Sequence, residues 1–217
     1  MNALQLFALA YKFAPVFLRQ SQPQQKSKTV LEEKDVTLIN LRNKDGAVIL
    51  ILGRRESGKT VLSQELAKFL DRPTYAVTPN QHPSIGIKEI QLEDVENVPE
   101  NSTLLLDDLP VYMSSRDYQE TLVRNIERMI PVVRHKKIML IFISQTSGFA
   151  DRWVMDADAI FLKQSSLLYA DLERPAVKKL MDKAKPYFNG KPEEWVKRHC
   201  YLITDSWEGL LEVKKTT

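Results

Sequence analysis

The chain has 217 residues, of which 43% are hydrophobic, and it carries a net charge of +3 with a sequence pI of about 8.8. This length suits one domain with extensions, and the mildly basic balance permits a nucleic-acid partner without requiring one. Cys200 is the single cysteine, which excludes an internal disulfide and fits a reducing cytosol. No cluster of cysteine and histidine has the spacing of a zinc site.

Residues 1–19 are largely apolar and predict an amphipathic helix that is too short and too interrupted to span a membrane. This helix has two open interpretations. It packs on the domain or on a neighbouring subunit, or it docks at a capsid vertex or a membrane surface. Residues 20–29 are polar without periodicity. We therefore expect residues 1–29 to form a helix and a flexible linker, followed by one domain over residues 30–217.

A short hairpin is expected ahead of the next motif. Residues 36–41, VTLINL, have the composition of a strand, and residues 43–46, NKDG, have the chemistry of a turn. The apolar run over residues 47–52 then predicts a strand that is buried on both faces.

Residues 53–60 have the sequence GRRESGKT, which matches the G-x-x-x-x-G-K-T spacing of a phosphate-binding loop, or Walker A motif. Residues 61–70 after it predict an amphipathic helix, so the motif has the strand before it and the helix after it that the loop requires. Backbone N–H groups of the curled loop hold phosphate oxygens, and the helix adds its positive end. Lys59 is expected to contact the β- and γ-phosphates, and Thr60 to bind Mg²⁺. The predicted nucleotide-binding residues are Gly53, Arg54, Arg55, Glu56, Ser57, Gly58, Lys59 and Thr60.

A short strand is expected over residues 74–78, and an irregular surface excursion over residues 79–101. Residues 102–108, STLLLDD, then form an apolar strand that ends in two acids, which is the Walker B pattern. Asp107 is expected to hold Mg²⁺, and Asp108 to polarise the attacking water. A plainer role for Asp108, a cap on the following turn, stays open.

The remaining elements alternate between helices and strands. A helix is predicted over residues 114–130 and a buried strand over residues 138–145, which ends in Gln145. The amide of Gln145 is expected to sense the γ-phosphate or to orient water, unless it is an ordinary amide at the end of a strand. Further predictions are a strand over 158–163, a helix over 173–188, and a terminal hairpin with strands over 200–204 and 210–213.

The order of these elements resembles that of the additional-strand P-loop ATPases. The motifs LLLDD, VVRHKK and IFISQTS, together with the Walker A loop, are similar to those of the FtsK–HerA superfamily. They are most similar to those of genome-packaging ATPases of tailless, often membrane-containing icosahedral viruses. The resemblance covers roughly residues 45–165. It implies a RecA-like α/β fold with a parallel sheet flanked by helices, in which the Gln145 strand lies between the Walker A and Walker B strands. The predicted C-terminal β-hairpin lies beyond the residues that the resemblance covers.

The resemblance also implies an activity. Relatives of this kind hydrolyse ATP with Mg²⁺ and move double-stranded DNA, in this case to package a viral genome into a preformed capsid. They act as homo-oligomeric rings, often hexamers, which implies that Arg134 is supplied to a neighbouring subunit, with Arg124 and Arg128 as competitors. The Asp108 position departs from the commoner Glu. The implied location is the host cytoplasm or the virion, or the periphery of a membrane.

Two other classes of function are open. The zonula occludens toxin-like phage assembly proteins also have an RH pair before a strand that ends in Gln, here Arg134 and His135. That resemblance implies an assembly or secretion ATPase anchored through residues 1–19. A small-molecule kinase is a third alternative, but the strand-end Gln145 and the lack of an arginine-rich lid weigh against it.

Overall fold

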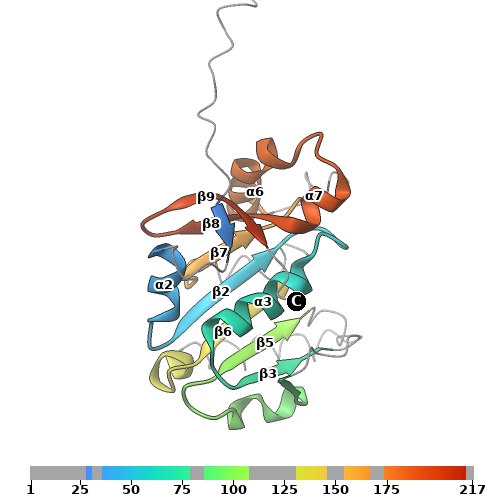
Figure 1. Cartoon of the computed structure of the whole chain (residues 1–217). Coiled ribbons are helices and arrows are strands. Elements are labelled where there is room, and N and C mark those ends of the chain that lie inside the picture. The colour runs from blue at the N-terminus through green and yellow to red at the C-terminus, as the bar shows by residue number, and fades with distance from the viewer. Residues whose placement is uncertain are drawn as a thin grey trace, which may run out of the picture.

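A computed structural model describes residues 28–30, 36–78, 86–107, 131–145, 154–166 and 174–213 (Figure 1). The strands in these ranges are β1 (Lys28–Val30), β2 (Ala47–Leu52), β3 (Thr74–Val77), β4 (Ile87–Glu89), β5 (Thr103–Asp107), β6 (Met139–Ser144), β7 (Ala159–Leu162), β8 (His199–Thr204) and β9 (Glu208–Val213). The helices are α2 (Val36–Arg42), α3 (Lys59–Leu70), the 3-10 helix η1 (Leu92–Asn97), α6 (Pro175–Phe188) and α7 (Glu193–Arg198), and residues 131–135 add a short helical turn.

The described strands form one sheet in the order β1-β9-β8-β7-β2-β6-β5-β3-β4. From β7 to β4 every neighbouring pair is parallel, with β2 between β6 and β7 and with β6 between β2 and β5. The strand that precedes Gln145 therefore lies between the Walker A and Walker B strands, as the resemblance implies. At the other side of the sheet, β8 is antiparallel to β7 and to β9, which confirms the C-terminal hairpin.

The core has two halves, one on each face of the sheet. All six residues of β2 are buried, and they alternate between the faces because successive side chains of a strand point to opposite sides. Ile49 and Ile51 belong to the cluster that contains the leucines of α2 and α3, whereas Val48 and Leu50 belong to the cluster that contains the apolar side chains of α6. Figure 1 shows α3 crossing in front of β2 and β6. The fold is the predicted RecA-like sheet flanked by helices.

The prediction of a strand over residues 36–41 is wrong, because these residues form helix α2. Leu38 and Leu41 are buried and lie three residues apart, which places both on one face of a helix, while Val36 is 69% exposed. Arg42 then pairs with Asp71 at the end of α3, with 3.1 Å between the guanidinium and the carboxylate. β-Branched residues disfavour a helix by only a few tenths of a kcal/mol, so the burial of two leucines decides the structure.

Three smaller differences from the sequence predictions concern the ends of the chain and one loop. Residues 79–101 were expected to be irregular, yet they include β4 and η1, and Val95 of η1 is buried. Helix α7 was not predicted. The last two residues of the predicted linker, Lys28 and Thr29, belong to β1, which pairs in parallel with β9.

In the ranges given above, no helix has both the length and the apolarity that crossing a membrane requires.

The assignment of residues 36–42 to a helix can be tested by mutation. Leu38→Ala should lower the free energy of unfolding by about 2–5 kcal/mol, because it empties a fully buried site. Val36→Ala should change it by less than about 0.5 kcal/mol, because Val36 is exposed. In a strand, residues 36 and 38 would face the same side and both would be costly. Urea denaturation of the two variants distinguishes the alternatives.

Candidate nucleotide-binding site

The site lies where three parallel strands end. β2 runs into the loop 53–58 and then into α3, β5 ends at Asp107, and β6 is followed by Gln145. The register pairs Leu52 with Ser144 and Asp107 with Ile143, so these ends are level with one another. The carboxyl ends of parallel strands in such a sheet form the usual crevice for a ligand.

The loop is folded around a lysine and a left-handed glycine. Gly58 has φ 86° and ψ 25°, a conformation that favours glycine, and it leads directly into α3. Residue Lys59 is 7% exposed, and its ammonium donates a hydrogen bond of 2.8 Å to the carbonyl of Arg54. The buried Ser57 hydroxyl donates to the same carbonyl at 2.8 Å. These bonds curl residues 54–59 into one turn at the positive end of α3, where an anion is stabilised.

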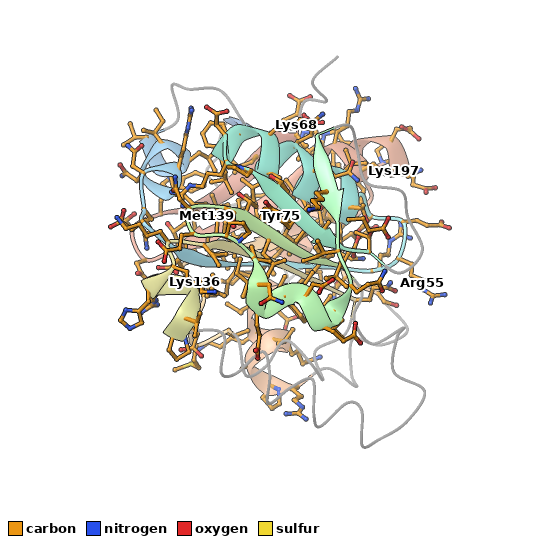
Figure 2. The ribbon with its side chains drawn as sticks, turned by 90° about the horizontal axis from the view of Figure 1, so that it is seen from below. Arg55, Lys68, Tyr75, Lys136, Met139 and Lys197 are labelled. Carbon is orange, nitrogen blue, oxygen red and sulfur yellow. The ribbon has the colours of Figure 1, made fainter. Side chains whose placement is uncertain are left out.

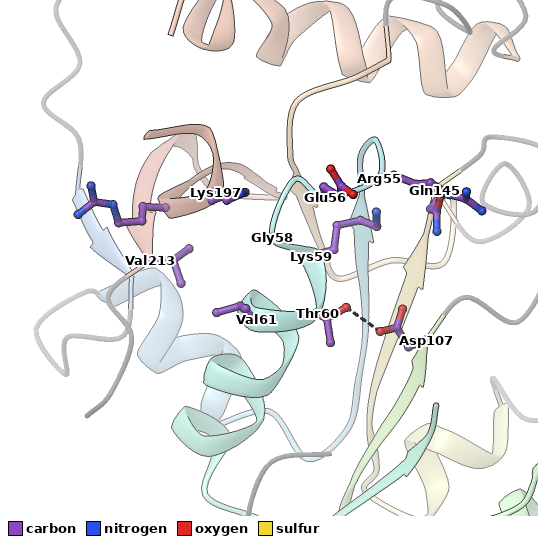
Figure 3. A pocket seen from close by; sticks show the side chains of 11 residues that line it. Arg55, Glu56, Gly58, Lys59, Thr60, Val61, Asp107, Gln145, Lys197 and Val213 are labelled. Atoms are coloured by element: carbon purple, nitrogen blue, oxygen red, sulfur yellow. Dashed lines mark hydrogen bonds between the residues drawn. The ribbon is translucent and has the colours of Figure 1, made fainter. Parts of the chain in front are cut away.

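Thr60 and Asp107 come together from the two Walker motifs (Figure 3). The Thr60 hydroxyl donates a hydrogen bond of 2.9 Å to the Asp107 carboxylate, which is 5% exposed. Both groups offer hard oxygen atoms, which Mg²⁺ prefers, and Mg²⁺ is usually held by one or two such protein ligands with phosphate and water as the others. In the described part of the chain no cluster of three acidic, histidine or cysteine residues is suited to a metal. The residues present therefore fit a magnesium ion that is bound together with a nucleotide.

Gln145 reaches the loop from the strand between the two Walker strands. Its side-chain oxygen accepts a hydrogen bond of 3.0 Å from Nε of Arg55, and both side chains line the same cavity as Lys59 (Figure 3). On the other side of the loop, Arg54 is tied to Gln164 twice, at 2.8 Å between backbone atoms and at 2.8 Å between side chains. The loop is thus attached to the residues that follow both neighbouring strands, β6 and β7.

The cavity has a volume of about 630 Å³ and extends beyond the loop. Its far wall is formed by Lys197, Arg198 and Val213, which the sequence analysis did not identify. Figure 3 shows Lys197 and Val213 on the opposite side of Gly58 and Val61 from Asp107. The hydrogen bond that Lys197 donates to the Glu193 carboxylate raises the pKa of Lys197 above its ordinary value. No local signal marks these residues, because a charged helix end is typical of a solvated surface.

Arg134 lies at the opposite edge of the sheet from the loop of its own chain. The Cα of Arg134 is 3.2 Å from where a Cβ on Gly46 would lie, and Gly46 precedes β2 while the loop follows it. Six residues of strand separate the two positions, or about 20 Å. Figure 2 shows Lys136, which is in the same segment, on the other side of the molecule from Arg55 and Lys197. Any contact of Arg134 with a nucleotide would have to involve another subunit.

Several predicted features lie outside the described residues. They are Asp108, the helix over 114–130 with Arg124 and Arg128, and residues 1–19. Their roles stay predictions.

Comparison with known proteins supports the fold. Neither a protein-family profile nor a curated protein sequence matches the chain. Among solved structures, the chain is similar to B204, the DNA-packaging ATPase from Sulfolobus turreted icosahedral virus, with a TM-score of 0.50 and 16% identity over 81% of this chain and 100% of that one. It is also similar to the cytoplasmic domain of the type VII secretion ATPase EccC from Thermomonospora curvata, with a TM-score of 0.50 and 12% identity over 77% of this chain and 25% of that one. The chain has the fold of these P-loop ATPases.

The close packing of the loop predicts a cost for a methyl group at Gly58. A Cβ there would lie 2.7 Å from the carbonyl oxygen of Lys197, a backbone atom, whereas a Cβ at Gly190 would meet nothing within 4 Å. Both glycines have positive φ, of 86° and 70°. Gly190→Ala should therefore cost about 1 kcal/mol of unfolding free energy for its conformation alone, and Gly58→Ala about 2–3 kcal/mol. Equal losses in urea denaturation would contradict the contact between Gly58 and Lys197.

Proposed function

We propose that this chain is a magnesium-dependent ATPase that moves double-stranded DNA and packages a viral genome into a preformed capsid. The observation that carries the proposal is the contact of Thr60 with Asp107, together with Gln145 on the strand between them. The likeness of the fold to a viral DNA-packaging ATPase supports the choice of cargo. The net charge of +3 is compatible with phosphate contacts to DNA.

Each residue of the site has a defined part in the proposed hydrolysis. The N–H groups of residues 53–60 and the Lys59 ammonium hold the phosphates, while Thr60 and Asp107 hold the metal. Bound Mg²⁺ neutralises charge that develops on the transferred phosphoryl group. Gln145 orients the attacking water, and Asp108 polarises it. Arg55, which donates to Gln145 at 3.0 Å, fixes the amide so that its oxygen faces the loop.

The proposal includes a homo-oligomeric ring, with a hexamer as the simplest case. In such a ring the amino edge of one sheet faces the nucleotide of the next subunit, and Arg134 supplies positive charge to that nucleotide. The Arg134 side chain is 60% exposed and lies 4.0 Å from Asp158, so it is available at the surface of its own chain. Residues 1–19 make the contact with a capsid vertex or a membrane, and the protein works in the host cytoplasm or on the virion.

The first test is ATP hydrolysis with and without linear duplex DNA. We expect DNA to stimulate turnover, and Lys59→Ala to reduce turnover by at least about 100-fold because the phosphates lose their cation. Lys68→Ala is the matched control, since Lys68 lies on the same helix but pairs with Glu65 at 3.0 Å, away from the cavity. Turnover that survives in Lys59→Ala would exclude the proposed site.

A different class of function has one observation in its favour. The chain is as similar in fold to the secretion ATPase EccC as to the packaging ATPase, with a TM-score of 0.50 for each. A membrane-associated assembly or secretion ATPase would hydrolyse ATP at the same site. Its turnover would not respond to DNA, and deletion of residues 1–19 would release it from membranes.

The proposed role of Arg134 predicts complementation between variants. Arg134→Ala should reduce the turnover rate by a factor of about 10³ to 10⁵, as removal of such an arginine does in comparable ATPases. Mixing it with Lys59→Ala should restore turnover, because a loop from one variant then meets an arginine from the other. Arg42→Ala is the control, an arginine at the same edge that pairs with Asp71. If mixing restores nothing, Arg134 does not act between subunits.

A further inference from the structure

A second lysine lies beside the nucleotide-binding loop, and the mechanism above does not use it. Lys163 follows β7 and its side chain is fully buried. Its ammonium donates hydrogen bonds to three backbone carbonyls, at 3.1 Å to Val196, 2.9 Å to Lys197 and 2.6 Å to His199. All three carbonyls belong to the end of α7 and the start of β8.

Lys163 also contacts the loop from the other side. Its backbone N–H donates to the carbonyl of Leu52 at 2.7 Å, and a Cβ on Gly53 would lie 2.6 Å from the Cβ of Lys163. The second glycine of the loop, Gly58, packs against the carbonyl oxygen of Lys197, which Lys163 holds. One residue therefore contacts the first glycine directly and the second through a carbonyl that it binds.

The chemistry explains why a lysine occupies this position. The last carbonyls of a helix have no partner within the helix and carry its negative end, so they favour a cation. An ammonium has three N–H groups, and here each of them has an acceptor, which offsets part of the cost of burying the charge. A neutral side chain of the same length would take a donor away from all three carbonyls, of which that of Val196 would keep the backbone N–H of His199.

We propose that Lys163 is a positioning residue for the nucleotide-binding loop, because it holds the end of α7 against Gly58. In doing so it sets both the curvature of residues 53–58 and the place of the cavity wall formed by Lys197 and Arg198. The effect on ATP binding rests on the function proposed above. The effect on the loop itself does not.

Burial lowers the pKa of Lys163 to about 8, with Cys200 acting to raise it and Lys59 acting to lower it. The ammonium is therefore charged at pH 7 and becomes neutral between about pH 7 and pH 9. A neutral amine has two N–H groups, so above this range at most two of the three carbonyls keep a donor from Lys163. Two neighbours of Lys163 have shifted pKa values of their own: burial lowers the pKa of His199 and raises that of Cys200 to about 12.

The low pKa does not mean that raising the pH releases α7. Because the pKa of Lys163 in the folded protein lies below its ordinary value of 10.5, the unfolded chain binds more protons between about pH 8 and pH 10.5. This group alone therefore makes the unfolding free energy rise with pH in that window. A local opening that exposes Lys163 to water has the same sign, so the role of this residue is tested at pH 7, where the ammonium is charged.

Arg72 provides a matched control. Its guanidinium also donates only to backbone carbonyls, those of Arg42, Lys44, Asp45 and Lys137, at 2.6–3.3 Å. These carbonyls lie at the amino edge of β2 and β6, at the far end from the loop. Removing either side chain takes a donor away from several backbone carbonyls, but only the change at Lys163 concerns the site.

The experiment compares the full chain with Lys163→Met and Arg72→Met. Hydrogen exchange of the amides of residues 53–60 is measured at pH 7 without nucleotide, and affinity for a fluorescent ATP analogue with Mg²⁺ is measured at the same pH. We expect Lys163→Met to lower protection of these amides by about tenfold or more, and affinity by a similar factor, while Arg72→Met changes neither even if its melting temperature falls.

Two results would overturn the proposal. One is normal protection of residues 53–60 in a folded Lys163→Met protein. The other is a loss of protection in Arg72→Met as large as that in Lys163→Met, which would show that the loop responds to the loss of any such donor. If Lys163→Met does not fold, Lys163→Gln, which keeps an N–H donor without the charge, takes its place, and normal loop protection in that variant overturns the proposal. A chain that binds no ATP would contradict the proposed function, and the exchange result would still test the role of Lys163.

Discussion

The parallel pairing of β6 between β2 and β5 is the constraint on which the site depends. Its register makes Leu52, Ser144 and Asp107 end at one edge, so the two Walker motifs, 47 residues apart along the chain, meet at 2.9 Å. A slip of one residue in either pairing would turn the side chain of Asp107 to the other face of the sheet. The continuous burial of β2, β5 and β6 prevents such a slip, because each of these strands is covered on both faces.

Much of this arrangement can be predicted from the sequence because its signals are local. The apolar runs of β2 and β6 have no polar residue until their carboxyl ends, where the chain changes to glycine, serine or glutamine. Such a run is typical of a central parallel strand, and the residue that follows it is at the ligand-binding edge. The spacing of Gly53, Gly58 and Lys59 identifies the loop for the same reason, since all its parts lie within eight residues.

The wrong and missing predictions concern elements whose structure is decided by packing against residues far away in the sequence. The apolar and β-branched residues of α2 fit a strand as well as a helix, and only the packing of Leu38 and Leu41 against the sheet selects the helix. Helix α7 has six residues, too few for a periodic pattern, and it is held at its end by Lys163, 33 residues before Val196. The cavity wall of Lys197, Arg198 and Val213 is missed for the same reason.

The Walker A motif therefore identifies the residues of the loop, but the conformation of the loop also depends on contacts with residues outside the motif. Gly58 has no room for a Cβ because a backbone carbonyl of α7 occupies that space, and Gly53 has none because of the side chain of Lys163. Both glycines are usually explained by the curvature that phosphate binding requires, yet in this chain Gly58 is also required by packing against α7, and Gly53 by packing against Lys163. The residues after β7 carry no recognisable motif, but they contribute one wall of the cavity and both of these contacts. A chain truncated after β7 would keep the Walker motifs and lose the surroundings that hold the first of them in its binding conformation.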